Sequence, residues 1–102
     1  MQVSGDMVDI MLSIMRNKRA STRVVELAAE VIAADARFNE KVGNAKASSQ
    51  AGNRIFPAID FADQILKECK ELNHKFADGL DIGELCDALA KIKTKVEGFD
   101  FS

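Results

Sequence analysis

Apolar residues recur along this chain at alternating steps of three and four, the spacing of one buried face of an α-helix. In the first half the series keeps one register from Val3 to Ala45 and contains only three polar positions. The series is Val3, Met7, Ile10, Ile14, Asn17, Ser21, Val24, Ala28, Val31, Asp35, Phe38, Val42 and Ala45. A register held this long predicts one helix from about residue 6 to 43, about 55 Å long. The polar run RNKRAST, residues 16–22, is the place where a loop would split it.

The second half repeats the pattern over residues 55–76 and again over 82–99. The two stretches are out of phase by about one residue. We therefore expect a second helix over about 57–97, with a kink or short break near 78–83. Asp81, with Glu84 three residues later, has the capping-box pattern that would begin a new helix there. No segment alternates with period two, so the predicted class is all-α.

Residues 44–56 are expected to form the bend between the two helices, with Gly43 and Asn44 ending the first. Asn53 is the expected N-cap of the second helix, and Pro57 fits its first turn. The predicted bend residues are Gly52, Asn53, Phe56 and Pro57. Two long helices with a short connection form an antiparallel helical hairpin, here a single domain spanning residues 1–102.

One hairpin does not account for all of the apolar residues. Ten of them, including Val25 and Leu80, lie outside the predicted two-helix seam. The other eight are the predicted partner-binding residues: Met11, Leu12, Met15, Leu27, Ile32, Phe61, Ile65 and Leu72. Three arrangements would cover them. These are a homodimer that forms a four-helix bundle, a helical protein partner, or a self-contained bundle of three or four helices if both polar segments are true breaks.

Composition and charge argue against several classes of function. The net charge is −2, so we expect no binding to nucleic acid, and the cluster Arg16, Lys18, Arg19 and Arg23 is interpreted as a solvated face. No apolar run approaches the ~20 residues that span a bilayer, so membrane insertion is not expected. The first residues lack a basic region and do not resemble a Sec signal peptide. The chain is expected in the cytoplasm, or exported without such a signal.

Catalytic and metal chemistry is not expected. His74 is the only histidine, so a histidine pair cannot form. Cys69 and Cys86 would be about 25 Å apart on one helix, too far for a disulfide. Leu80 and Ile82 occupy positions where a calcium loop needs oxygen ligands. We expect no cofactor, no metal and no enzymatic activity.

In length and predicted shape the chain resembles the small helical-hairpin proteins of type VII secretion. Their bend carries Trp-x-Gly, where this chain has QAGN, residues 50–53, with Gly52 and Asn53. It is most similar to the Trp-less relatives that accompany LXG toxins. The resemblance implies an export signal near the end of the second helix, for which Phe99 and Asp100, in the tail after Lys95, are the candidates.

The resemblance implies a non-enzymatic targeting partner that packs its apolar face on a toxin's helical domain or on another small hairpin. The alternative is a self-associating helical-bundle adaptor or regulatory protein, a homodimer unrelated to secretion.

Overall fold

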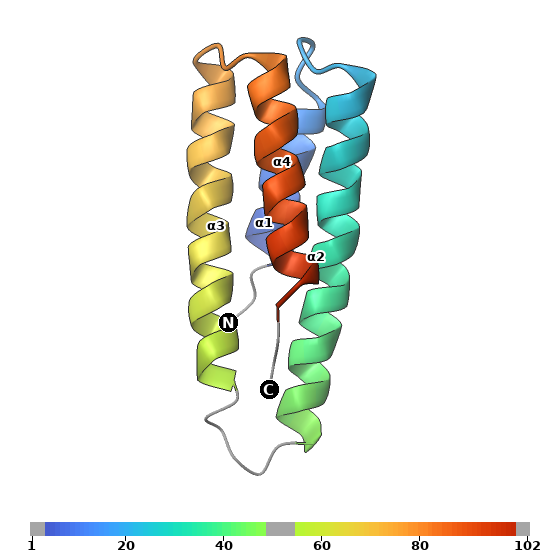
Figure 1. Ribbon diagram of the computed structural model, residues 1–102, viewed down its shortest axis with the longest axis vertical. Coiled ribbons are helices and arrows are strands. Elements are labelled where there is room, and N and C mark those ends of the chain that lie inside the picture. The colour runs from blue at the N-terminus through green and yellow to red at the C-terminus, as the bar shows by residue number, and fades with distance from the viewer. Residues whose placement is uncertain (1–3, 49–54, 100–102) are drawn as a thin grey trace.

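The computed structural model describes residues 4–48 and 55–99, and these residues form four helices and no strands (Figure 1). The helices are α1 (Ser4–Met15), α2 (Thr22–Ser48), α3 (Ile55–Ala77) and α4 (Ile82–Glu97). The all-α class is therefore confirmed. The two long helices predicted over about 6–43 and 57–97 are not found, because residues 16–21 and 78–81 are true breaks. The fold is therefore the third of the predicted arrangements, a self-contained bundle of four helices.

The first break is a turn held by its own residues. The Ala20 N–H donates to the backbone oxygen of Asn17 at 3.0 Å, and the Arg19 N–H donates to the Asn17 side-chain oxygen at 2.9 Å. The hydroxyl of Ser21 then accepts the Val24 N–H at 3.3 Å, as an N-cap does. Asn17 and Ser21 are polar members of the apolar series, so local side-chain bonding ends a helix that the register alone would continue.

The second break follows a helix end at which Gly79 has φ of 104°, in the left-handed region that favours glycine. The Leu80 N–H donates to the Lys75 oxygen at 3.0 Å, which satisfies a carbonyl at the end of α3. Asp81 then caps α4, accepting from the N–H groups of Gly83 at 2.8 Å and Glu84 at 3.3 Å. The predicted cap at Asp81 is confirmed.

The connection between α2 and α3 differs from the predicted bend in where it starts. Gly43 and Asn44 do not end the first helix, since α2 continues to Ser48. Pro57 lies in the first turn of α3, as predicted. Gly52 and Asn53 lie outside the described residues. Phe56 belongs to α3, but its side chain also lies outside the described part.

The four helices form an elongated bundle of 47 × 19 × 19 Å. The α1–α2 and α3–α4 hairpins pack so that α1 contacts α2 and α3, and α4 also contacts α2 and α3. In Figure 1, α4 lies in front and α1 behind, with α3 on the left and α2 on the right. The described parts of α1 and α4 do not contact each other. The longer helices α2 and α3 extend beyond both.

All four helices contribute to one apolar core. Most of the series predicted for the first half is buried: Met7, Ile14, Val24, Ala28, Val31, Asp35 and Phe38. The second half contributes Ala58, Ala62, Ile65, Cys69, Leu72, Phe76, Leu85, Leu89, Ile92 and Val96. Because four stripes face one another, much of the apolar surface that two helices would leave exposed is covered within this chain.

Candidate functional site

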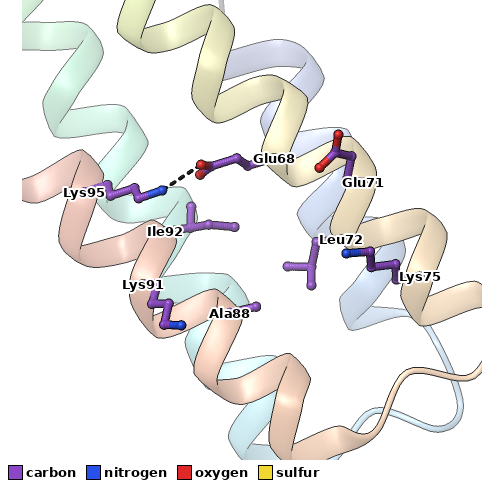
Figure 2. A pocket seen from close by; sticks show the side chains of 8 residues that line it. All are labelled: Glu68, Glu71, Leu72, Lys75, Ala88, Lys91, Ile92 and Lys95. Atoms are coloured by element: carbon purple, nitrogen blue, oxygen red, sulfur yellow. Dashed lines mark hydrogen bonds and ion pairs between the residues drawn. The ribbon is translucent and has the colours of Figure 1, made fainter.

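An open groove of about 230 Å³ lies between α3 and α4 (Figure 2). These helices pack less closely against each other than α2 and α4 do. The apolar lining of the groove comes from Leu72 on α3 and from Ala88 and Ile92 on α4. Leu72 and Ile92 are also core residues, so the groove opens directly onto the edge of the core. The small side chain of Ala88 leaves room at the α4 wall.

The rims of the groove carry charges of both signs. Glu68, Glu71 and Lys75 line the α3 side, and Lys91 and Lys95 line the α4 side. At one end Lys95 Nζ reaches across to Glu68 Oε1 at 2.6 Å (Figure 2). Both side chains of this pair are partly exposed, so the pair contributes at most ~1 kcal/mol to stability.

The rest of the rim holds charges that no side chain within residues 4–48 and 55–99 pairs with. Among the described residues, the side chains of Glu71, Lys75 and Lys91 have no partner in a hydrogen bond or ion pair. Their charges are therefore available to an approaching molecule. An apolar floor between unpaired charges of both signs is a surface suited to another helix, which has side chains of both kinds at fixed spacing.

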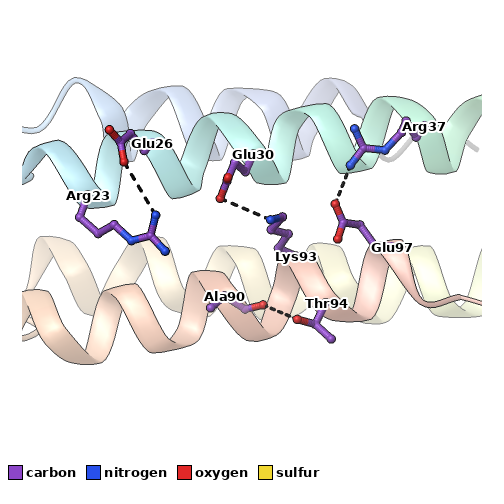
Figure 3. A network of polar contacts seen from close by, with 8 residues as sticks. All are labelled: Arg23, Glu26, Glu30, Arg37, Ala90, Lys93, Thr94 and Glu97. Carbon is purple, nitrogen blue, oxygen red and sulfur yellow. Dashed lines mark hydrogen bonds and ion pairs between the residues drawn. The ribbon is translucent and has the colours of Figure 1, made fainter.

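The opposite side of α4 is occupied by contacts with α2 (Figure 3). Arg37 pairs with Glu97 at 2.6 Å and Lys93 with Glu30 at 3.5 Å. These pairs bridge two helices that are closely packed against each other. The exposed face of the α3–α4 hairpin is therefore the candidate surface.

The structure places the eight predicted partner-binding residues in two groups. Met11, Leu27, Ile65 and Leu72 are buried in the chain's own core, whereas Leu12, Met15, Ile32 and Phe61 are half-buried. The premise that all eight lie outside the intramolecular contact is wrong for the buried group, because four helices rather than two surround them. Met15, Ile32 and Phe61 of the half-buried group also pack against this core. Only Leu72 also lines the α3–α4 groove.

The predicted tail signal begins in a folded region. Val96 is buried in α4, which continues to Glu97. Phe99 stacks on Phe61 at a ring-centroid distance of 4.4 Å and meets Phe38 edge-on at 5.5 Å. Phe99 therefore packs on α2 and α3 beyond the end of α4. Asp100 lies outside the described residues, so its part in a signal stays a prediction.

The core contains one acid and one thiol. Asp35 is 1% exposed, and its Oδ2 has no hydrogen-bond partner among the described residues. Burial raises the pKa of Asp35 to about 6, and the side chain of Asn39 offsets part of this effect. The pKa of Cys69 is raised to about 12 by burial and by the nearby charges of Asp35 and Glu68. Cys69 therefore keeps its proton and is a poor nucleophile. Cys69 and Cys86 are both free thiols, as predicted.

Sequence reasoning missed the charged rim of the groove. A signal was available, since Lys91 and Lys95 stand one turn apart on α4 and would share a face. The sequence does not give the distance between α3 and α4. This distance decides whether a groove is open beside the two lysines. The described residues include no group of three or more His, Cys, Asp or Glu side chains that could hold a metal ion.

None of the described helices has the length and apolar character needed to cross a membrane. Comparison of the chain with family models, curated proteins and solved structures finds no match.

Proposed function

We propose that this chain is a non-enzymatic helical protein that binds a helix of another protein in the α3–α4 groove. One observation supports this proposal most directly: an apolar floor flanked by the unpaired charges of Glu71, Lys75 and Lys91. The complementary ligand is an amphipathic helix. Its apolar side chains would contact Leu72 and Ile92, with a basic residue toward Glu71 and an acidic residue toward the lysines.

The more specific form of the proposal is a targeting partner in bacterial type VII secretion, bound to the N-terminal helical domain of an LXG toxin. The all-α fold is compatible with this assignment, and the sequence resemblance motivates it. The bound toxin helix would lie outside the four-helix core. This assignment therefore does not require the bundle to open.

The proposal is tested by co-expressing the chain with the N-terminal helical domain of an LXG toxin. The affinity is measured for the wild type and for Lys91→Glu. We expect at least a tenfold loss of affinity, because the substitution places a negative charge opposite the acidic residue of the ligand. Lys70→Glu makes the same change of net charge at an exposed position that does not line the groove, so it should leave the affinity unchanged.

The location of the ligand is confirmed if an acidic-to-lysine substitution on the toxin helix restores binding to the Lys91→Glu variant. Equal losses for Lys70→Glu and Lys91→Glu would show a nonspecific charge effect and contradict the groove. If wild-type protein retains no toxin domain, the secretion assignment is wrong.

Deleting residues 100–102 rather than the whole tail tests the export signal, because Val96 and Phe99 belong to the packed structure.

A further inference from the structure

We propose that two copies of this chain exchange α1, so that residues 4–48 form one continuous helix and each α1 completes the bundle of the other copy. The partner is a second copy of the same chain, and the interaction surface is the seat that α1 now occupies on α2 and α3. This inference does not depend on the α3–α4 groove.

Apolar contacts hold α1 in its seat on α2 and α3. Met7, Met11 and Ile14 are fully buried against α2 and α3. In the described part of the chain, no ion pair or side-chain hydrogen bond joins α1 to another helix, whereas ion pairs tie α4 to both of its neighbours. Apolar contacts form equally well with an identical seat in another molecule. An exchanged α1 is therefore held by the same apolar contacts as an α1 that packs in its own chain.

The connection between α1 and α2 contains nothing that requires a turn. Residues 16–21 include no glycine or proline, and none of the described non-glycine residues has a positive φ. The apolar series also continues through this segment in one register, with Asn17 and Ser21 at its positions. The turn is held by the backbone bond from the Ala20 N–H to the Asn17 oxygen and by the side-chain oxygens of Asn17 and Ser21, which accept from the N–H groups of Arg19 and Val24. Without those bonds, the segment has the pattern of a helix interior.

A continuous helix would carry α1 out of its own bundle, because α1 now runs back along α2. The vacated seat would then be filled by α1 of the second copy. Each copy loses and gains the same contacts with α2 and α3. The balance between monomer and dimer is therefore set by the turn, by protein concentration and by charge in the connecting segment. Arg16, Lys18 and Arg19 of both copies would come together near the dyad, so salt should favour the dimer.

Two variants of the turn shift this balance in opposite directions. Asn17→Ala with Ser21→Ala removes both side-chain bonds and improves helix propensity, so we expect the dimer dissociation constant to fall at least tenfold. Lys18→Pro suits the second position of the existing Asn17–Ala20 turn but would break a continuous helix. We expect this variant to remain monomeric. Solution mass is measured over a concentration series for the wild type and both variants, with far-UV circular dichroism to show that each is folded.

A distance measurement separates exchange from side-by-side association. Spin labels are attached at Asp6→Cys and Ala33→Cys, two exposed positions on α1 and α2, with Cys69→Ala and Cys86→Ala removing the native thiols. Labelled protein is diluted into unlabelled protein so that only distances within one chain are read. In the exchanged dimer the two positions lie about 40 Å apart along one helix. In the monomer they lie on neighbouring helices, at a much shorter distance.

Exchange is supported by a dimer that is strengthened in the Asn17→Ala/Ser21→Ala variant, is absent in Lys18→Pro and shows the long distance. The proposal is overturned if the alanine variant stays monomeric at every concentration. A dimer that survives Lys18→Pro, or that keeps the short distance within each chain, also overturns it. Loss of toxin binding does not affect this test of exchange. The presence or absence of a dimer does not affect the test of helix binding in the groove.

Discussion

The buried carboxyl of Asp35 should make the stability of this protein fall as the pH rises from acid to neutral. The folded state holds the pKa at about 6, against 3.8 for the free side chain. The folded chain therefore favours the protonated form, and the resulting stability is complete below about pH 4 and lost as the pH passes 6. A shift of about two units corresponds to about 3 kcal/mol. This is a large part of the 5–15 kcal/mol that stabilises a typical domain.

Asp35→Asn tests this magnitude, because asparagine has nearly the same shape and does not titrate. Urea unfolding is followed by circular dichroism at several pH values between 4 and 7, for wild type and variant. The buried amide has its own cost, of roughly 1–3 kcal/mol, but that cost does not change with pH. The quantity to compare is the difference in stability between the two proteins at pH 7 minus the same difference at pH 4. We expect it to favour the variant by about 3 kcal/mol.

Asp63→Asn is the matched control, because it removes one carboxylate from an exposed position on α3. Its unfolding free energy should follow that of the wild type across the whole pH range, apart from small effects of net charge. If Asp35→Asn also follows the wild type, the carboxyl is hydrated or paired in solution, and its assignment to a dry core is wrong. Direct titration of the Asp35 carboxyl by NMR would decide between these explanations.

Four further substitutions or measurements test separate parts of the structure. Asp81→Ala removes the cap of α4 and should lower the unfolding free energy by about 1 kcal/mol in urea. Phe99→Ala should cost about 2 kcal/mol, less than a fully buried phenylalanine, because the ring is half-buried. Glu68→Gln should change stability by less than ~1 kcal/mol, since the pair that it breaks is partly exposed. With a thiol reagent, Cys69 should react much more slowly than Cys86, and a rate equal to that of Cys86 would contradict its burial.

The sequence predicted the helical class and most of the buried positions, because heptad-like spacing reports directly which side of a helix faces apolar neighbours. It did not establish the break at 16–21. Asn17 and Ser21 keep the register of the series, and their bonds to nearby N–H groups leave no trace in it. The break at 78–81 was easier to anticipate, since Gly79 and Asp81 are residue types that end and begin helices. The groove depends on how far α3 stands from α4, which no local pattern encodes.

The two breaks therefore differ in physical kind. Gly79 has a positive φ that other residues adopt only with strain, so the α3–α4 turn is fixed by the backbone. The α1–α2 turn is held by one backbone bond, from the Ala20 N–H to the Asn17 oxygen, and by two side-chain bonds, each of which typically contributes ~1 kcal/mol. The contacts that bury Met7 and Met11 are worth several times more, but they are the same whether α1 stays or is exchanged. A small local free energy, rather than the large one of packing, thus decides whether the first half of the chain is a hairpin or one long helix.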